Sequence, residues 1–111
     1  MSDSGDKIKT YIGDFSFGKN TPKNFDSHIG KSVPLYNMGQ ELIANLSSFF
    51  LVEGSRVYDL GCSTANISKK IVNYNKQIDV KVFAVDIEKK MLQTAKSFFS
   101  KREKKKIKLI N

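Results

Sequence analysis

The sequence predicts an α/β fold built on an open sheet of three parallel strands in the spatial order 3-2-1. Three short apolar runs predict the strands, at Val57–Leu60, Lys81–Asp86 and Ile107–Ile110. Two segments with apolar residues at helical spacing separate these runs, at 66–72 and from Glu88 to about Lys101. Right-handed crossovers on one face build a sheet outwards from its first strand, and this fixes the expected order.

The turn after the first strand is the predicted ligand site. Gly61 breaks the apolar run, and only small residues follow it up to Ala65, where helical spacing begins. A ligand can therefore approach the backbone of this turn closely. The start of the next helix offers unpaired N–H groups and a positive dipole end. This strand, turn and helix together indicate a loop for a nucleotide-type cofactor.

Two carboxylates are expected beside this turn. Asp59 can pair with a cationic group such as an amino-acid ammonium, but it would repel a pyrophosphate. Asp86 follows 27 positions later, at the carboxyl end of the neighbouring strand, where a carboxylate can accept both hydroxyls of a ribose. Alternatively, Asp86 caps the helix that starts near Glu88.

The glycine pattern separates two classes of cofactor. A dinucleotide fingerprint has three glycines, Gly-x-Gly-x-x-Gly, whereas this turn has Gly61 with Ser63 and Ala65. With the two carboxylates, this pattern favours S-adenosylmethionine over a dinucleotide. A nicotinamide-dependent dehydrogenase is the less favoured alternative.

These motifs resemble a known family. The run Asp59-Leu-Gly-Cys-Ser63, with Val85-Asp86, is similar to the first half of class I S-adenosylmethionine-dependent methyltransferases, which have a Rossmann-like fold. Upstream segments resemble more particularly the carboxy-S-adenosylmethionine synthase family of tRNA wobble-uridine modification. These segments are Gly13–Phe17, Phe25 and Lys31–Tyr36. The resemblance covers about residues 13–110 but only the first half of such a protein.

The resemblance implies cofactor contacts from six residues, to which the charge argument adds Asp59. The predicted cofactor-binding residues are Tyr36, Asp59, Gly61, Cys62, Ser63, Asp86 and Ile87. In that family prephenate supplies the carboxyl group, and the residues that hold it lie mostly in the second half, so no catalytic residue is assigned here. Two positions differ from the family pattern, because Leu35 and Ala65 stand where glycine is common.

The chain divides into two expected parts. Residues 1–35 form an N-terminal arm and cap segment, with 1–12 frayed, an irregular arm over 15–25 and a short helical turn over 26–32. Residues 36–111 form a partial S-adenosylmethionine-binding domain. This domain begins with a helix over 36–50 whose apolar stripe is expected to dock on the sheet. The stripe consists of Met38, Leu42, Ile43, Leu46, Phe49 and Phe50.

Length, cysteine content and apolar runs limit the class of protein. At 111 residues the chain is about half of a complete fold of this class, at ~30 residues for each strand–helix unit. One cysteine and one histidine provide neither an internal disulfide nor a zinc cluster. No apolar run approaches the ~20 residues that span a bilayer. We therefore expect a cytoplasmic protein with no metal and no membrane partner.

Charge and the free sheet edge bear on partners. Residues 101–108 hold six basic residues against Glu103, a net +5 of the chain's +8. This cluster either contacts RNA phosphates or is the solvated end of a helix. The acceptor is a tRNA or a small molecule. The first strand lacks a neighbour on one side, so we expect the chain to form a homodimer, to bind a missing C-terminal half or to be incompletely stable.

Two functions from different classes remain. The leading hypothesis is an S-adenosylmethionine-dependent methyltransferase or its cofactor-binding half, similar to carboxy-S-adenosylmethionine synthase. The alternative is a non-catalytic cofactor-binding or assembly fragment that needs a partner chain.

Overall fold

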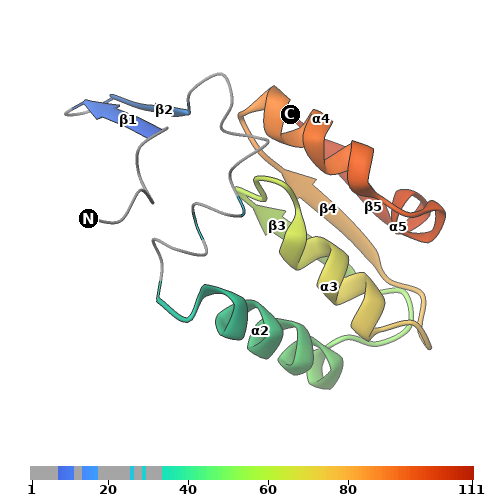
Figure 1. Cartoon of the computed structure of the whole chain (residues 1–111). Helices are drawn as coiled ribbons and strands as arrows, with labels where there is room; N and C mark the ends of the chain where they lie inside the picture. Colours follow the sequence, from blue (N-terminus) through green and yellow to red (C-terminus); the bar gives the residue numbers. More distant parts are fainter. Residues whose placement is uncertain (1–7, 12–13, 18–25, 27–28, 30–33) are drawn as a thin grey trace.

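The centre of the structure is a three-stranded parallel sheet. The computed structural model describes residues 8–11, 14–17, 26, 29 and 34–111. Within this part, the strands lie in the order β3-β4-β5 (Figure 1). Their bounds are Arg56–Leu60 for β3, Lys81–Val85 for β4 and Ile107–Ile110 for β5. The predicted order 3-2-1 is confirmed, and the sheet is the first half of a Rossmann-like fold.

Helices α3 (Asn66–Tyr74) and α4 (Lys89–Phe98) pack on one face of this sheet (Figure 1). Residues alternate along a strand, so every second side chain of β4 faces the helices, and Val82 and Ala84 are completely buried. These side chains form the core together with Ile71, Val72, Leu92, Ala95, Phe99 and Ile107. The two predicted crossover helices therefore exist, although α3 continues to Tyr74.

The other face of the sheet is open in the described part of the chain. Tyr58 of β3 lies beside Phe83 of β4, which lies beside Lys108 of β5. The rings of Tyr58 and Phe83 stack with 5.1 Å between centroids and an interplanar angle of 17°. Leu60, two residues after Tyr58 in β3, faces the same side of the sheet and is 76% exposed. One face of the sheet is thus a core and the other a surface.

The N-terminal prediction needs correction where the structure describes it. Residues 8–11 were expected to be frayed and 15–17 irregular, but Ile8–Tyr11 (β1) and Asp14–Phe17 (β2) form an antiparallel pair. Two short β-prone runs separated by Ile12 and Gly13 are a hairpin pattern. Of the turn predicted over 26–32, Asp26 and Ile29 are helical, and the other residues lie outside the described part, as does Phe25.

Helix α2 has the predicted bounds, Tyr36–Phe50, but the wrong face was predicted to be buried. The helix packs against α3 through Gln40 and Ala44, and Glu41 accepts hydrogen bonds from Lys70 and Tyr74 of α3. Its apolar stripe does not dock on the sheet. All six residues of the stripe are exposed, Phe49 by 82%. The side of α2 that meets α3 therefore carries Gln40, Glu41 and Ala44 and not the apolar stripe.

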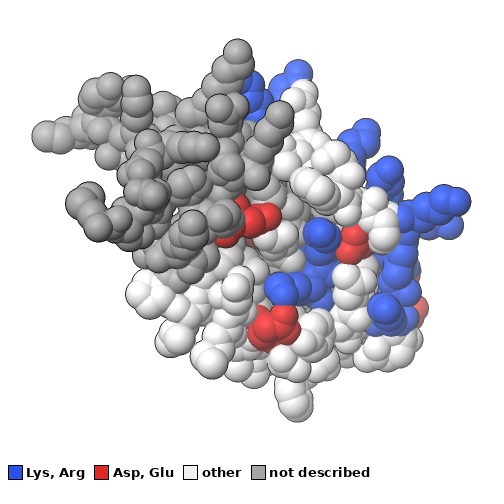
Figure 2. Space-filling view, viewed as in Figure 1, with Lys and Arg blue, Asp and Glu red and all other residues white. Residues whose placement is uncertain are grey.

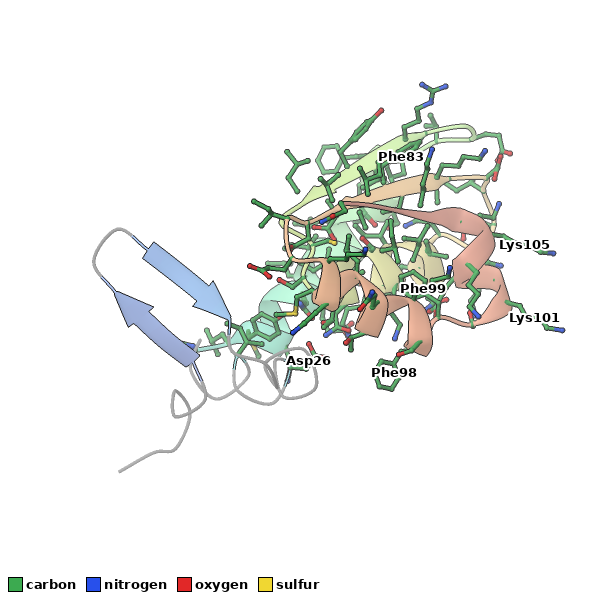
Figure 3. All side chains as sticks on the ribbon, turned by 90° about the horizontal axis from the view of Figure 1, so that it is seen from above. Asp26, Phe83, Phe98, Phe99, Lys101 and Lys105 are labelled. Atoms are coloured by element: carbon green, nitrogen blue, oxygen red, sulfur yellow. The ribbon has the colours of Figure 1, made fainter. Side chains whose placement is uncertain are left out.

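The helix predicted from Glu88 to about Lys101 is two helices. Helix α4 ends at Phe98, and α5 (Lys101–Lys106) starts again after Ser100. A capping box causes this break, since the Glu103 N–H donates to Ser100 Oγ (3.1 Å) and the Ser100 N–H donates to Glu103 Oε1 (2.8 Å). Phe98, predicted to be buried, is 70% exposed and points away from the sheet (Figure 3).

Basic side chains gather on one side of the molecule (Figure 2). The lysines of α5 lie on this side, and Lys106 pairs with Asp79 before β4. Within the residues that the structure describes, none of the helices has the length and hydropathy needed to cross a membrane.

The residue before α2 adopts a backbone conformation that favours glycine. Leu35 has φ 59° and ψ 23°, in the left-handed region, and its side chain is 73% exposed. An L-residue in this region is destabilised by about 1–2 kcal/mol, whereas glycine has no such penalty. The sequence resemblance led us to expect glycine at position 35, and glycine there would relieve the backbone strain that Leu35 causes.

We predict that Leu35→Gly raises the free energy of unfolding by about 1 kcal/mol, because it removes this strain and little packing. In a domain of this size the melting temperature should rise by roughly 4–8 °C. Leu35→Ala is the matched control, since it also removes the exposed side chain but keeps the left-handed penalty. An equal rise in both variants would show that backbone strain is not the cause.

Candidate functional site

The loop between β3 and α3 is held against the end of β4. The N–H groups of Gly61 and Cys62 both donate to the carbonyl of Val85, at 2.8 and 2.9 Å. Gly61, Ser63 and Ala65 have positive φ, of 75°, 53° and 61°. A Cβ at Gly61 would meet no atom within 4 Å, so open space lies beside this backbone. The sequence prediction of a tight turn that leaves room for a ligand agrees with this geometry.

Asp86 ties the same loop to the second strand. Its Oδ2 accepts the Ser63 N–H at 2.8 Å, and its Oδ1 accepts the Glu88 N–H at 2.8 Å. The second bond closes a turn just before α4, whose N-cap is Glu88, so Asp86 contacts the N-cap residue but does not cap the helix as the sequence alternative proposed. Each carboxylate oxygen has two lone pairs, so both oxygens can accept a further hydrogen bond from a ligand.

Asp59 faces the helix side of β3 and is held by α3. The Ser68 hydroxyl, completely buried in the first turns of α3, donates to Asp59 Oδ2 at 2.7 Å. Asp59 lines the same hollow as Gly61 and Ser63, whose N–H is bound by Asp86. The two carboxylates therefore lie at the same end of the sheet, on either side of one loop.

A hollow of about 230 Å³ lies beside this loop. Tyr36 and Gln40 of α2 form one wall, and the Gln40 side-chain amide donates to the Tyr36 hydroxyl at 2.8 Å. Among the described residues that line it, none is Lys or Arg. The lining consists of Ile29, Tyr36, Gln40, Asp59, Gly61, Cys62, Ser63, Thr64, Asn66 and Ile67. Its volume is smaller than the usual range for a small-molecule pocket.

A third carboxylate, Asp26, stands at the start of α3. Its Oδ1 accepts hydrogen bonds from the Thr64 hydroxyl (2.8 Å) and the Asn66 side-chain amide (2.7 Å). Burial, followed by the nearby charge of Asp26, raises the pKa of the Tyr36 phenol, to which Asp59 also contributes. The Tyr36 hydroxyl therefore keeps its proton at neutral pH.

Cys62 is a buried thiol of the loop. Burial raises the pKa of its thiol to about 12, and the charges of Asp59 and Asp86 act in the same direction. The thiol is 7% exposed and forms no disulfide. Cys62 is therefore a neutral wall of the hollow at physiological pH and not a nucleophile.

Of the seven cofactor-binding residues predicted from the sequence, some line the hollow and others lie beside it. Five of them line the hollow: Tyr36, Asp59, Gly61, Cys62 and Ser63. Asp86 supports the loop from the β4 side, and Ile87 beside it is 89% exposed. Sequence reasoning missed Gln40 and Ser68. Gln40 lies one turn after Tyr36, a spacing that places both on one helix face, whereas no sequence signal joins Ser68 to Asp59.

Comparison with known proteins identifies relatives of this chain, although none of the family models searched matches it. The carboxy-S-adenosyl-L-methionine synthase of Campylobacter jejuni (strain 81-176) is 42% identical over 83 residues, 75% of this chain and 34% of the relative. The synthases of Campylobacter hominis and Mannheimia succiniciproducens are 38% and 35% identical, over 74% and 77% of this chain and 34% and 35% of their own lengths. The chain is related to the carboxy-S-adenosyl-L-methionine synthases.

The relationship confirms the family resemblance inferred from the sequence motifs. The chain spans about a third of the length of the synthases that it matches. Ala65, one of the two positions where the sequence resemblance leads us to expect glycine, lies in the loop itself and has φ 61° with a completely buried side chain. Like Leu35, this residue occupies a backbone conformation that suits glycine better.

We predict that Cys62 reacts slowly with iodoacetamide at pH 8. A thiol pKa of about 12 lies well above this pH, so the reactive thiolate is a minor species, and alkylation should be at least a hundredfold slower than for a free cysteine. The rate should rise with pH up to about 12. Mass spectrometry of the alkylated protein over time measures it, with the urea-unfolded chain as the control. Equal rates for the folded and unfolded chains would contradict the assignment.

Proposed function

We propose that this chain is the cofactor-binding half of an enzyme that uses S-adenosylmethionine, of the carboxy-S-adenosylmethionine synthase type. Residues 36–111 would form the partial binding domain, and residues 1–35 an arm and cap segment. The observation that carries this proposal is the acidic hollow beside the β3–α3 loop, which Asp59 lines and which has no Lys or Arg among its described lining residues.

The charge of the hollow selects among adenine-containing ligands. S-adenosylmethionine carries a sulfonium and an ammonium, both positive, whereas a dinucleotide carries a negative pyrophosphate. Asp26, Asp59 and Asp86 all lie around the loop, and Asp26 stands at the start of α3, where a pyrophosphate would bind. Opposite charges attract most strongly where water is partly excluded, so this site favours the cationic ligand.

The residues present fit such a ligand. Asp59 would pair with the ammonium group of the ligand. Because Gly61 has no side chain and open space lies beside it, the ligand could approach the backbone closely at this residue. Asp86 would accept ribose hydroxyls through its remaining lone pairs, with Ile87 beside it. The Tyr36 hydroxyl, which accepts from Gln40, still has its own proton to donate. The cofactor, once bound, supplies an activated methyl group, and these residues would hold and orient it.

The activity of the whole enzyme needs more than these residues. The names of the relatives indicate that they form carboxy-S-adenosyl-L-methionine. We propose the same product here, with a carboxyl donor such as prephenate held outside this chain's described residues. A role in the cytoplasm, in tRNA modification, follows from the same resemblance, with a tRNA or a small molecule as the final acceptor.

The alternative is a non-catalytic fragment that binds the cofactor and a partner chain. One observation favours an RNA contact in that case, because lysines of α5 such as Lys101 and Lys105 project away from the fold (Figure 3). The basic residues of α5 also have an explanation without RNA. Lysines in the last turn of a helix interact favourably with the negative end of its dipole and remain solvated.

We predict that Asp86→Ala weakens binding of S-adenosylmethionine and S-adenosylhomocysteine at least tenfold. Each hydrogen bond to a charged acceptor contributes about 1.5–3 kcal/mol, and the variant removes the ribose acceptor. Isothermal titration calorimetry measures the affinities, with NAD as the ligand that should not bind. Mass spectrometry of ligand retained by the purified protein identifies which adenosyl compound it prefers.

Asp79→Ala is the matched control, because Asp79 is an exposed carboxylate before β4, at the other end of the sheet. It should leave the affinity unchanged. Asp86→Asn keeps one oxygen acceptor near the loop and should have an intermediate effect. Unchanged affinity in Asp86→Ala, in a variant that still melts cooperatively, would refute the ribose role.

A further inference from the structure

A second hollow, of about 390 Å³, lies where α5 runs into β5, beside the start of β4. This volume falls within the usual range for a ligand pocket. Lysines from all three elements form most of its lining, and none of the described residues that line it is acidic. We call it the lysine hollow. Its lining consists of Lys81, Val82, Phe83, Lys104, Lys105, Lys106, Ile107 and Lys108.

The positive charges of the lysine hollow are poorly compensated within the described part of the chain. Lys106 pairs with Asp79, and its hydrogen bond and charge lower the pKa of that carboxyl. The other four lysines form no salt bridge with a described residue. Like charges that share one hollow repel one another, so an anion with several negative groups would be stabilised there.

Two stacked aromatic rings stand beside the lysine hollow, on the side of the sheet that faces away from the helices (Figure 3). Phe83 lines the hollow, and Tyr58 of the edge strand β3 stacks against it. Tyr58 is 60% exposed, so a further planar group can stack on the side of its ring that faces away from Phe83. The basic segment 101–108 contains no aromatic residue, and only the pairing of the strands brings it next to these rings.

Basic side chains also stand next to both rings along the strands. Arg56 lies two residues before Tyr58, and Lys81 lies two residues before Phe83. Side chains two positions apart in a strand share a face, so these four stand on the same side of the sheet. Arg56 and Lys81 are neighbours in the parallel register, and both are exposed. This side of the sheet therefore combines a stacking surface with a row of cations.

We propose that the lysine hollow and the Tyr58–Phe83 pair together bind a single-stranded nucleic acid. The lysines and Arg56 hold its phosphates, and a base stacks on the free side of the Tyr58 ring. Proteins that bind single strands without sequence preference combine these two features, a basic groove and aromatic side chains. The lysine hollow lies at the opposite end of the sheet from the β3–α3 loop, so this inference does not rest on the proposed cofactor site.

Other anions fit this surface less completely. Inorganic polyphosphate or an anionic membrane would bind the lysines, but neither offers a planar group to the rings. In a duplex the bases already stack on one another, so their faces are not free. The lysines and the rings together therefore favour unpaired bases on a phosphate backbone.

Fluorescence anisotropy tests the proposal with the full chain and a labelled single-stranded DNA of about ten nucleotides. An oligomer of the same length that carries the same phosphates on abasic sugars is the control. The DNA should bind about fivefold or more tightly than this control, because only the DNA can stack. The slope of log affinity against log salt should be roughly −2 to −3, as for about three or four phosphate contacts. No cofactor is added, so failure of the proposed cofactor site would not affect the result.

Tyr58→Ala should weaken binding of the DNA about fivefold or more and leave binding of the abasic oligomer unchanged, because it removes the stacking surface and no charge. Phe98→Ala is the matched control, since Phe98 is an exposed aromatic of α4 on the other side of the sheet, and this variant should bind like the parent chain. Circular dichroism checks that both variants are folded.

Lys104→Ala combined with Lys108→Ala should make the salt slope shallower by roughly 1.4, about 0.7 for each lost phosphate contact. Lys89→Ala combined with Lys90→Ala is the matched control, because it removes the same charge from exposed lysines that do not line the hollow. Four results would each overturn the proposal: equal binding of the two oligomers, unchanged affinity in Tyr58→Ala, the same change of slope in both lysine pairs, or binding of phosphatidylserine vesicles but not of the DNA.

Discussion

The carboxyl end of β4 is the constraint on which the site depends. The Val85 carbonyl accepts two loop N–H groups, and Asp86, the next residue, accepts a third from Ser63. These bonds fix a loop that has three residues at positive φ, a conformation that two non-glycine residues adopt only at a cost. Because adjacent parallel strands end at the same edge, the second strand shapes the binding loop of the first.

The charge of the site follows from this arrangement. Asp59 lines the hollow from β3, whereas Asp86 at the end of β4 and Asp26 of the N-terminal segment bind residues of the loop itself. Residues far apart in the sequence therefore converge on one loop. Burial keeps the nearby Cys62 thiol neutral by raising its pKa, and the charges of Asp59 and Asp86 add to this effect. An acidic loop at a helix start differs from the phosphate-binding version of the same fold, and this difference links the geometry to a cationic cofactor.

In the described part of the chain, helices cover one face of the sheet, and the other face carries the exposed side chains of Tyr58 and Leu60 together with Lys108. A small domain buries only a modest share of its apolar surface, and large apolar side chains rarely gather on the surface of a monomer. The exposure of Phe49 and Leu60 is therefore unusual. The core that does exist is centred on β4, which is flanked by both other strands. The β3–α3 loop begins at Gly61, directly after the edge strand β3, so the hollow lies at the end of this exposed edge.

Much of this could be predicted from the sequence. Apolar runs and helical spacing determined the three strands, their order, the bounds of α2 and the loop at Gly61, because these depend on local pattern and on the handedness of crossovers. Sequence patterns could not show which side of α2 is buried, since spacing identifies an apolar face but not the neighbour that meets it. They also could not show that Asp86 binds Ser63 and Glu88, or that Ser68 holds Asp59. Only the tertiary structure decided these contacts, because they join groups that the chain brings together after its strands have paired.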